Sequence, residues 1–345
     1  MHIHLLIPNL FWPDSSVKQV IKHCSLPALE SILTKSEILQ QPSEGIEAWL
    51  CEMFGVSKQQ DWPIAPITLN FDNKGDNLET NIKYWLRADP VHLRIANNHL
   101  LLADSRAFKI SLKEAAQFTD TFNRYFIKDG ISFTAFHPDR WYMGLSNIPN
   151  LQTRPLSYVI GKNINEQLPT EIDKGLTHKI LNEIQMLLHE HPMNLAREAQ
   201  GELMVNSVWL WGGGKMPKQF SCNFDCIWSN FPLTQALARM GNVPHHHLPL
   251  DINSWLRSIN KGNHLIVIDV LQDKVLYKFF NEWYEQLNLL EQNLFIPLLN
   301  AIKKDQIKQF TISTFNQSLV KHFQLTPRSL MKFWILKKPF LSFIN

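Results

Sequence analysis

The most unusual part of the chain is the stretch HPMNLAREAQGELMVNSVWLWGGGK, residues 191–215. Its first half places an asparagine and an arginine three residues apart, so that both side chains can face one pocket from a single helical turn. Its second half runs from an apolar segment into three glycines and a lysine, where backbone N–H groups and a positive charge can approach an anion. The candidate anion-binding residues of this stretch are Asn194, Arg197, Gly212, Gly213, Gly214 and Lys215.

Two interpretations of the glycine–lysine turn stay open. It is not a phosphate-binding P-loop, because the GxxxxGK[ST] spacing is absent and Met216 stands where the hydroxyl residue would be. The turn either contacts an anion or forms a hinge at which an inserted segment rejoins its parent sheet. Arg140 is a further candidate for anion contact, since arginine forms bidentate pairs with phosphate or carboxylate. Pairing with nearby surface aspartates is the alternative for Arg140.

Outward from this stretch, both ends of the chain show the alternating strand and helix patterns of an α/β protein. Residues 2–10 form an apolar run that predicts a buried strand, and residues 264–270 (HLIVIDV) and 309–314 predict two more. Helices are predicted over residues 233–240 and 282–304. The chain thus begins with a strand and a helix, is interrupted, and ends with a helix–strand–helix–strand pattern. This order predicts a doubly wound sheet with an inserted segment.

The middle of the chain shows the hairpin and helix patterns of an α+β domain. Residues 93–102 predict a hairpin whose turn is Asn97-Asn98, and Ser111 with Glu114 forms a capping box at a helix start. A long helix is predicted over residues 174–191, with one apolar face. Three residues share another of its faces, namely Asn182, Gln185 and His189.

The domain boundaries follow from the change between these two kinds of pattern. The polar stretch 72–80 (DNKGDNLET) is the best linker in the first third of the chain. We therefore expect a core built from residues 1–80 and 216–345, with an inserted domain over residues 81–215.

Composition excludes several classes of protein. The 345 residues are 45% hydrophobic, which is ample for one large domain or two modest ones. With 34 Lys+Arg against 31 Asp+Glu, the balanced charge argues against a nucleic-acid binder. No stretch reaches a membrane span and the start lacks signal-peptide features, so we expect a cytoplasmic protein with no membrane partner. Four cysteines form no disulfide framework, and Cys222 with Cys226 lacks the second pair of a zinc site.

Two aspartates are low-ranking candidates for catalysis. Asp269 ends a predicted buried strand, where open α/β sheets bind ligands, and Asp273 follows closely. The two carboxylates could share a metal or a proton, or Asp269 could cap the following helix. The run His245-His246-His247 is expected to be an exposed loop, because tetrahedral metal sites take ligands from separated positions.

A family resemblance is carried by the run Asn194-x-x-Arg197-x-x-x-Gly201-x-x-x-x-Asn206-x-x-Trp209-x-Trp211-Gly212-x-Gly214. It resembles the end of the inserted domain in archaeal-type cofactor-independent phosphoglycerate mutases, which belong to the alkaline phosphatase superfamily. The similarity extends upstream through Trp85-Leu86-Arg87, Gly130-Ile131-Ser132-Phe133, Arg140-Trp141-Tyr142 and Gly161-Lys162. The whole chain resembles a smaller bacterial group, the RpfE-type regulatory proteins. The resemblance implies an alkaline-phosphatase-like doubly wound α/β sheet with an inserted α+β domain.

The resemblance also implies where two metal ions would bind, and there the sequence departs from the family. The family's first strand ends in Asp-Gly, whereas this chain has Pro8-Asn9. A later Asp-x-x-Gly-His motif corresponds to the region of Asp269 and Asp273, which has no histidine. The family's Asp-His-Ser corresponds to Ser313-Thr314-Phe315-Asn316-Gln317-Ser318. Asparagine, threonine and phenylalanine do not hold divalent cations as carboxylate and imidazole do.

We therefore expect a phosphoglycerate-mutase-like pseudoenzyme without metal or other cofactor. It would act in regulation, with a phosphorylated small metabolite in the interdomain cleft and a regulatory protein as partners. The alternative is an active mutase or phosphatase whose rearranged site uses Asp269, Asp273, Asn9 and a histidine with Mn²⁺, Mg²⁺ or Zn²⁺. A scaffold without ligand is the third interpretation.

Overall fold

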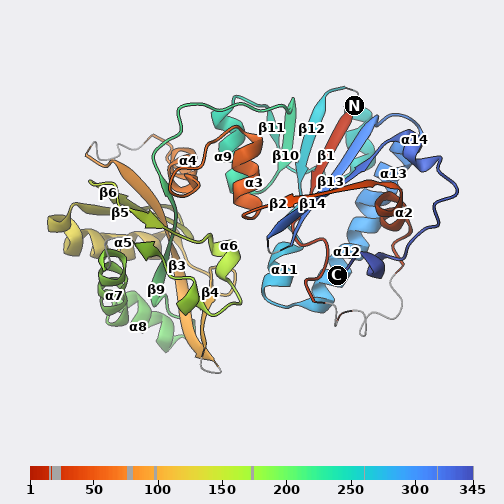
Figure 1. The fold of residues 1–345 in the computed structure, drawn as a ribbon. Coiled ribbons are helices and arrows are strands. Elements are labelled where there is room, and N and C mark those ends of the chain that lie inside the picture. The colour runs from red at the N-terminus through yellow and green to blue at the C-terminus, as the bar shows by residue number, and fades with distance from the viewer. Residues whose placement is uncertain are drawn as a thin grey trace. The chain divides into compact units, whose positions relative to one another are not determined.

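The computed structural model describes residues 1–14, 17, 25–75, 81–96, 99–171, 175–259, 261–316 and 318–344 (Figure 1). The chain divides into two compact units. The core unit comprises Met1–Gly55 and Phe220–Asn345, and the inserted unit comprises Val56–Gln219. Within the described residues, no helix combines the length and the apolar composition that crossing a membrane requires.

A seven-stranded sheet forms the centre of the core unit, in the order β11-β10-β12-β1-β13-β14-β2. Its strands are β1 (His2–Leu6), β2 (Glu37–Pro42), β10 (Cys226–Ser229), β11 (His245–His246), β12 (Asn263–Val267), β13 (Gln309–Asn316) and β14 (Leu319–Leu325). The first five strands in the spatial order run parallel; β14 pairs antiparallel with β13, and β2 pairs antiparallel with β14. The three strands predicted at residues 2–10, 264–270 and 309–314 lie side by side, with β1 between the other two. The prediction of an exposed loop at the histidine run is wrong for His245 and His246, which form the edge strand β11.

Helices pack against this sheet to complete the core unit (Figure 1). They are α2 (Pro27–Lys35), α3 (Ile46–Met53), α9 (Pro232–Met240), α10 (Ile252–Ser258), α11 (Gln272–Leu276), α12 (Phe280–Leu290), α13 (Ile296–Lys303), α14 (Pro327–Leu330) and the short η4 (Phe340–Phe343). The helix predicted over residues 282–304 is interrupted by a π-helical turn, η3 (Glu291–Phe295). Pro297 follows this turn, and a proline inside a helix removes one backbone hydrogen bond and crowds the preceding turn. The turn directs the buried Glu291 carboxylate at the backbone N–H groups of Ala28 and Leu29, at 2.6 and 3.0 Å.

The inserted unit is built on a five-stranded antiparallel sheet. Its strands are β3 (Tyr84–Ala96), β4 (His99–Ala103), β5 (Ile131–His137), β6 (Arg140–Leu145) and β9 (Ser207–Gly214), and a separate pair is formed by β7 (Leu151–Gln152) and β8 (Thr170–Glu171). The order is β4-β3-β6-β5, with β9 pairing along β3 as well. Its helices are α4 (Ile64–Asp72), α5 (Leu112–Phe126), η1 (Ile127–Asp129), α6 (Leu156–Val159), η2 (Ile164–Glu166), α7 (Leu176–His189) and α8 (Pro192–Ala199).

Several local predictions for this unit can be compared with the structure. The hairpin strands pair as β3 and β4, although the turn residues 97 and 98 lie outside the described residues. The capping box of Ser111 and Glu114 is confirmed. The helix predicted over residues 174–191 is α7, whose described part begins at Leu176 and ends at His189.

The start of the inserted unit lies earlier than the sequence indicates. The sequence placed the boundary near residue 80, whereas the structure divides after Gly55. The predicted linker 72–80 does not begin at Asp72, because that residue is the buried end of α4. Helix α4 packs Ala65 and Leu69 against Tyr142 of β6, which assigns it to the inserted unit. Residues 76–80 lie outside the described residues.

Candidate functional site

The carboxyl ends of β1, β12 and β13 are where the sheet topology would place a ligand in the core unit. The register sets Leu6 between Val267 and Ser313, so the chain continues from these positions into Pro8, Asp269 and Phe315. Asp269 supplies the one carboxylate among these three continuing positions, and neither proline nor phenylalanine can bind a cation through its side chain. Within the described residues, no three His, Cys, Asp or Glu side chains form a group that could hold a metal ion. The described residues at these strand ends therefore do not fit a binuclear centre.

The loop after β1 is closed by bonds within the protein. Asn9 has a φ of 58°, a left-handed conformation that asparagine tolerates better than most residues. Its carbonyl accepts a hydrogen bond from Trp283 Nε1 at 3.1 Å, and the next N–H, of Leu10, donates to Thr314 Oγ1 at 3.2 Å. These bonds fix the loop in the place where a metal-binding aspartate would be expected.

The two candidate aspartates occupy different settings. The backbone carbonyl of Asp269 accepts from Gln272 N at the turn leading into α11. The Asp273 carboxylate lies 3.3 Å from Lys274 Nζ, which lies 2.9 Å from Glu282. Asp273 is thus part of a partly exposed ion-pair network.

Arg197 and Asn194 are both buried and hold the inserted unit together. Arg197 donates to the Glu114 carboxylate at 2.6 Å and to the carbonyls of Leu203 and Lys109 at 2.8 and 2.9 Å. Burial opposes ionisation of Glu114, but hydrogen bonds from Ser111 and Arg197 outweigh it and lower the pKa of that carboxyl.

The Asn194 amide is similarly occupied. It donates to the carbonyls of Leu188 and Val205, each at 2.7 Å, and accepts from Val205 N at 3.0 Å. The asparagine and the arginine of the motif therefore join α8 to its neighbouring segments, and their polar atoms are engaged within the unit.

Arg140 is engaged in the same way. It forms a bidentate pair with Asp72, with N···O distances of 2.8 and 2.7 Å, and the Tyr142 hydroxyl donates to the same carboxylate at 2.6 Å. Burial favours the neutral acid, but these bonds prevail and lower the pKa of Asp72.

The glycine run lies in strand β9, so the prediction of a turn at these residues is wrong. A Cβ at Gly212 would lie 2.9 Å from Ile64, one at Gly213 would lie 2.6 Å from the Tyr84 hydroxyl, and one at Gly214 would lie 2.7 Å from Pro63. Two residues of β9 oppose one of β3 here, and Gly212, with a φ of 63°, forms the bulge. Close packing inside the inserted unit thus explains the three glycines.

Two backbone N–H groups at the glycine run are likewise bound within the unit. Gly212 N donates to Thr153 Oγ1 at 3.0 Å, and Lys215 N donates to Gln59 Oε1 at 2.9 Å. The side chain of Lys215 is exposed.

A buried ion pair lies on β3 and also binds a tryptophan of β9, whereas the sequence places such arginine–aspartate pairs at the surface. Arg87 donates through Nε and NH2 to Asp89 Oδ1 at 3.0 and 2.6 Å, and Trp211 Nε1 donates to Asp89 Oδ2 at 2.7 Å. The guanidinium carbon lies 5.3 Å from the centre of the Tyr142 ring and 5.2 Å from that of Trp211. The alternation of an arginine and an aspartate two residues apart in a strand was the available signal, since such residues share a face.

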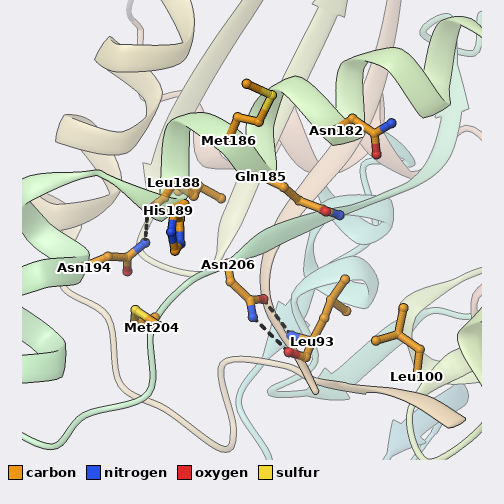
Figure 2. Close-up of a pocket in the computed structure, with 10 residues that line it drawn as sticks. All are labelled: Leu93, Leu100, Asn182, Gln185, Met186, Leu188, His189, Asn194, Met204 and Asn206. Carbon is orange, nitrogen blue, oxygen red and sulfur yellow. Dashed lines mark hydrogen bonds between the residues drawn. The ribbon is translucent and has the colours of Figure 1, made fainter. Parts of the chain in front are cut away.

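A groove of about 690 Å³ in the inserted unit brings together amide, thioether and aliphatic side chains (Figure 2). It is lined by Leu93, Leu100, Asn182, Gln185, Met186, Leu188, His189, Asn194, Met204 and Asn206. These residues come from β3, β4, α7, α8 and the segment before β9. None of the ten is an aspartate, glutamate, lysine or arginine, so the groove suits an uncharged ligand with hydrogen-bonding groups.

Asn206 closes one side of this groove. Its side chain accepts from Leu93 N at 2.7 Å and donates to Leu93 O at 2.8 Å, as a further residue of a paired strand would (Figure 2). On α7, the residues that share a face by periodicity, Asn182, Gln185 and His189, all line the groove. No hydrogen bond joins the side chain of Asn182 or His189 to another residue in the described part of the chain. Sequence reasoning missed Met204 as a lining residue.

Replacing Asn206 by alanine should lower the free energy of unfolding by about 1 kcal/mol, because the Leu93 backbone groups lose both partners but can still reach water. Urea denaturation followed by tryptophan fluorescence measures this change. Asn182→Ala is the matched control and should stay within about 0.5 kcal/mol of the parent, since its side chain is exposed and unbonded. Equal losses in the two variants would contradict the role given to Asn206.

Comparison with known proteins places this geometry in context. No protein-family model matches the chain. A 2,3-bisphosphoglycerate-independent phosphoglycerate mutase of Methanosarcina mazei is 30% identical over 138 residues, which are 39% of this chain and 35% of that protein. A probable enzyme of the same name from Geobacter sulfurreducens is 27% identical over 139 residues, 34% of its length. The chain thus matches about a third of the length of these curated relatives.

A solved structure resembles the whole chain. The PH0037 protein from Pyrococcus horikoshii aligns with 96% of this chain and 92% of its own, with a TM-score of 0.51 and 11% sequence identity. The fold class predicted from the sequence is confirmed as an α/β architecture with an inserted unit, and the overall fold is similar to that of the PH0037 protein. By sequence, about 39% of the chain is distantly homologous to the cofactor-independent phosphoglycerate mutases.

Proposed function

We propose that this chain is a metal-independent, non-catalytic relative of the cofactor-independent phosphoglycerate mutases. Its role would be regulatory, as the resemblance to RpfE-type proteins implies. The observation that carries the proposal is the end of β1, where Pro8 and Asn9 replace an anionic ligand. Bonds from Trp283 and to Thr314 close that loop within the protein. A two-metal phosphoryl transferase needs carboxylates and imidazoles at this place to clamp the reacting oxygens.

Ligand binding is assigned to the groove between α7, β3 and β4. The sequence favoured a phosphorylated metabolite, but Arg197 and Arg140 are already bound to Glu114 and Asp72. An anionic ligand would have to displace these carboxylates from buried pairs, which is costly. The groove offers the unbonded side chains of Asn182 and His189 instead, beside exposed or half-buried methionine and leucine side chains.

The catalytic part of the proposal is tested by metal content and by mutase activity. Elemental analysis of untagged protein, after dialysis against Mn²⁺ or Zn²⁺ and then metal-free buffer, should find no stoichiometric ion. Conversion of 3-phosphoglycerate to 2-phosphoglycerate should not exceed the rate in buffer. The alternative, a surviving mutase or phosphatase, predicts bound ions and an activity that Asp269→Asn abolishes. Either result would overturn the proposal.

The binding part is tested separately by thermal shift. Short uncharged peptides, acetylated and amidated at their ends, should raise the melting temperature, whereas 3-phosphoglycerate should not. The peptide effect should be lost in Asn182→Ala/His189→Ala and kept in Asn165→Ala, which changes an exposed asparagine that does not line the groove. A shift with 3-phosphoglycerate alone would favour the anion site predicted from the sequence.

A further inference from the structure

Large apolar side chains are exposed together near the end of the core unit. In the segment Arg328–Lys338, RSLMKFWILKK, the exposed fractions are 70% for Met331, 86% for Phe333, 67% for Trp334 and 84% for Leu336. Single exposed apolar residues are ordinary, but grouped ones mark interaction surfaces. We call residues 328–338 the aromatic-basic segment.

The backbone of this segment is fixed by helix α2. Lys35 Nζ donates to the carbonyls of Lys332 and Ile335, the latter at 2.6 Å. Lys338 N donates to Thr34 Oγ1 at 2.9 Å. These bonds hold the main chain in place while the apolar side chains stay in solvent, so little ordering is needed when the segment meets a partner.

The charge of the segment is entirely positive. It contains Arg328, Lys332, Lys337 and Lys338 and no acidic residue. Lys337 lies 2.9 Å from the buried Glu30 carboxylate. Among the described residues, no ion pair involves Arg328, Lys332 or Lys338, so these three cations are available to an anionic partner.

We propose that the aromatic-basic segment docks on a membrane surface that contains anionic phospholipid. Phenylalanine, tryptophan and leucine bury well at the boundary between headgroups and acyl chains, while lysine meets the lipid phosphates. The occupant is argued from charge complementarity and from the mixture of aromatic and basic side chains without a single carboxylate. The expectation of no membrane partner rested on the absence of a spanning stretch, which surface docking does not need.

Co-sedimentation of the full chain with vesicles tests this proposal. The protein should pellet with vesicles of equal parts phosphatidylcholine and phosphatidylglycerol and not with phosphatidylcholine alone. Lys332→Gln/Lys338→Gln should weaken the apparent affinity about 30-fold, since each lysine near an anionic surface contributes about 1 kcal/mol. Phe333→Ser/Trp334→Ser should abolish pelleting, because the apolar anchor is removed.

Matched controls separate docking from general effects of charge or folding. Lys113→Gln/Lys128→Gln removes two exposed lysines of the inserted unit, and Leu250→Ser removes an exposed leucine elsewhere in the core unit; both variants should bind as the parent does. Unchanged melting temperatures show that the variants are folded. The proposal is overturned if the parent ignores phosphatidylglycerol vesicles, or if the aromatic variant still binds them. It is also overturned if the variants change only the oligomeric state in light scattering, which would assign the segment to a second copy of the chain.

Discussion

Replacing Asp89 by alanine should lower the free energy of unfolding of the inserted unit by about 3 to 5 kcal/mol. Arg87 and Asp89 are only 6% and 2% exposed, so the variant would leave a guanidinium buried without its counter-charge. Trp211 Nε1 would lose its acceptor as well. Burial raises the pKa of Asp89 to about 6, so urea denaturation should be measured at pH 8, where the carboxylate is ionised.

Two further variants make this prediction specific. Arg87→Met/Asp89→Ala should be more stable than Asp89→Ala alone, because removing both charges costs less than isolating one. Asp120→Ala, at an exposed position of α5, should change the free energy of unfolding by no more than about 0.5 kcal/mol. If the double variant is no more stable than Asp89→Ala, the loss does not come from the unpaired arginine.

Lowering the pH from 7 to 5 should destabilise the core unit by about 2 kcal/mol through His4 alone. His4 Nε2 lies 2.6 Å from Ser313 Oγ, which lies 2.6 Å from His322 Nδ1, and the His4 ring packs against Trp49 and Phe224. Burial, and secondly the charge of His322, lower the pKa of His4 to about 3. Below pH 6.5 the unfolded chain therefore binds a proton that the folded chain does not, and stability falls as the pH falls.

The slope of stability against pH is the quantity to compare between variants. His4→Gln should flatten the curve of unfolding free energy between pH 7 and 5, whatever its effect at pH 7. His2→Gln, an exposed histidine on the same strand, should leave the slope unchanged. A parallel slope in the His4 variant would show that this half-buried histidine does not control the acid response.

The fold could be predicted from the sequence because apolar runs and caps are local signals. Strands β1, β12 and β13 are short apolar runs, and the Ser111–Glu114 box marks the start of α5. The π-helical turn at Glu291 was not predictable, because its carboxylate caps α2 and that partner lies far away in the chain.

The candidate site was harder to predict for the same reason. The face of α7 that carries Asn182 and His189 followed from helical periodicity, and it does line the groove. Arg197 of the central motif was predicted to contact an anionic ligand, because the sequence does not reveal that its guanidinium lies 2.6 Å from the Glu114 carboxylate. The glycines likewise suggested an anion-binding turn, whereas their neighbours Ile64, Tyr84 and Pro63 show that they admit close packing.

The core unit is built from the two ends of the chain, and this arrangement has a consequence for biosynthesis. Strand β1 pairs with β12 and β13, so His2 cannot pair until Asn263 and Gln309 have been translated. At about 5 to 20 residues per second, that delay is of the order of 10 to 60 s. The inserted unit is one continuous segment and can fold on the ribosome during this interval. An early apolar strand without its neighbours is a target for chaperones until the last third of the chain emerges.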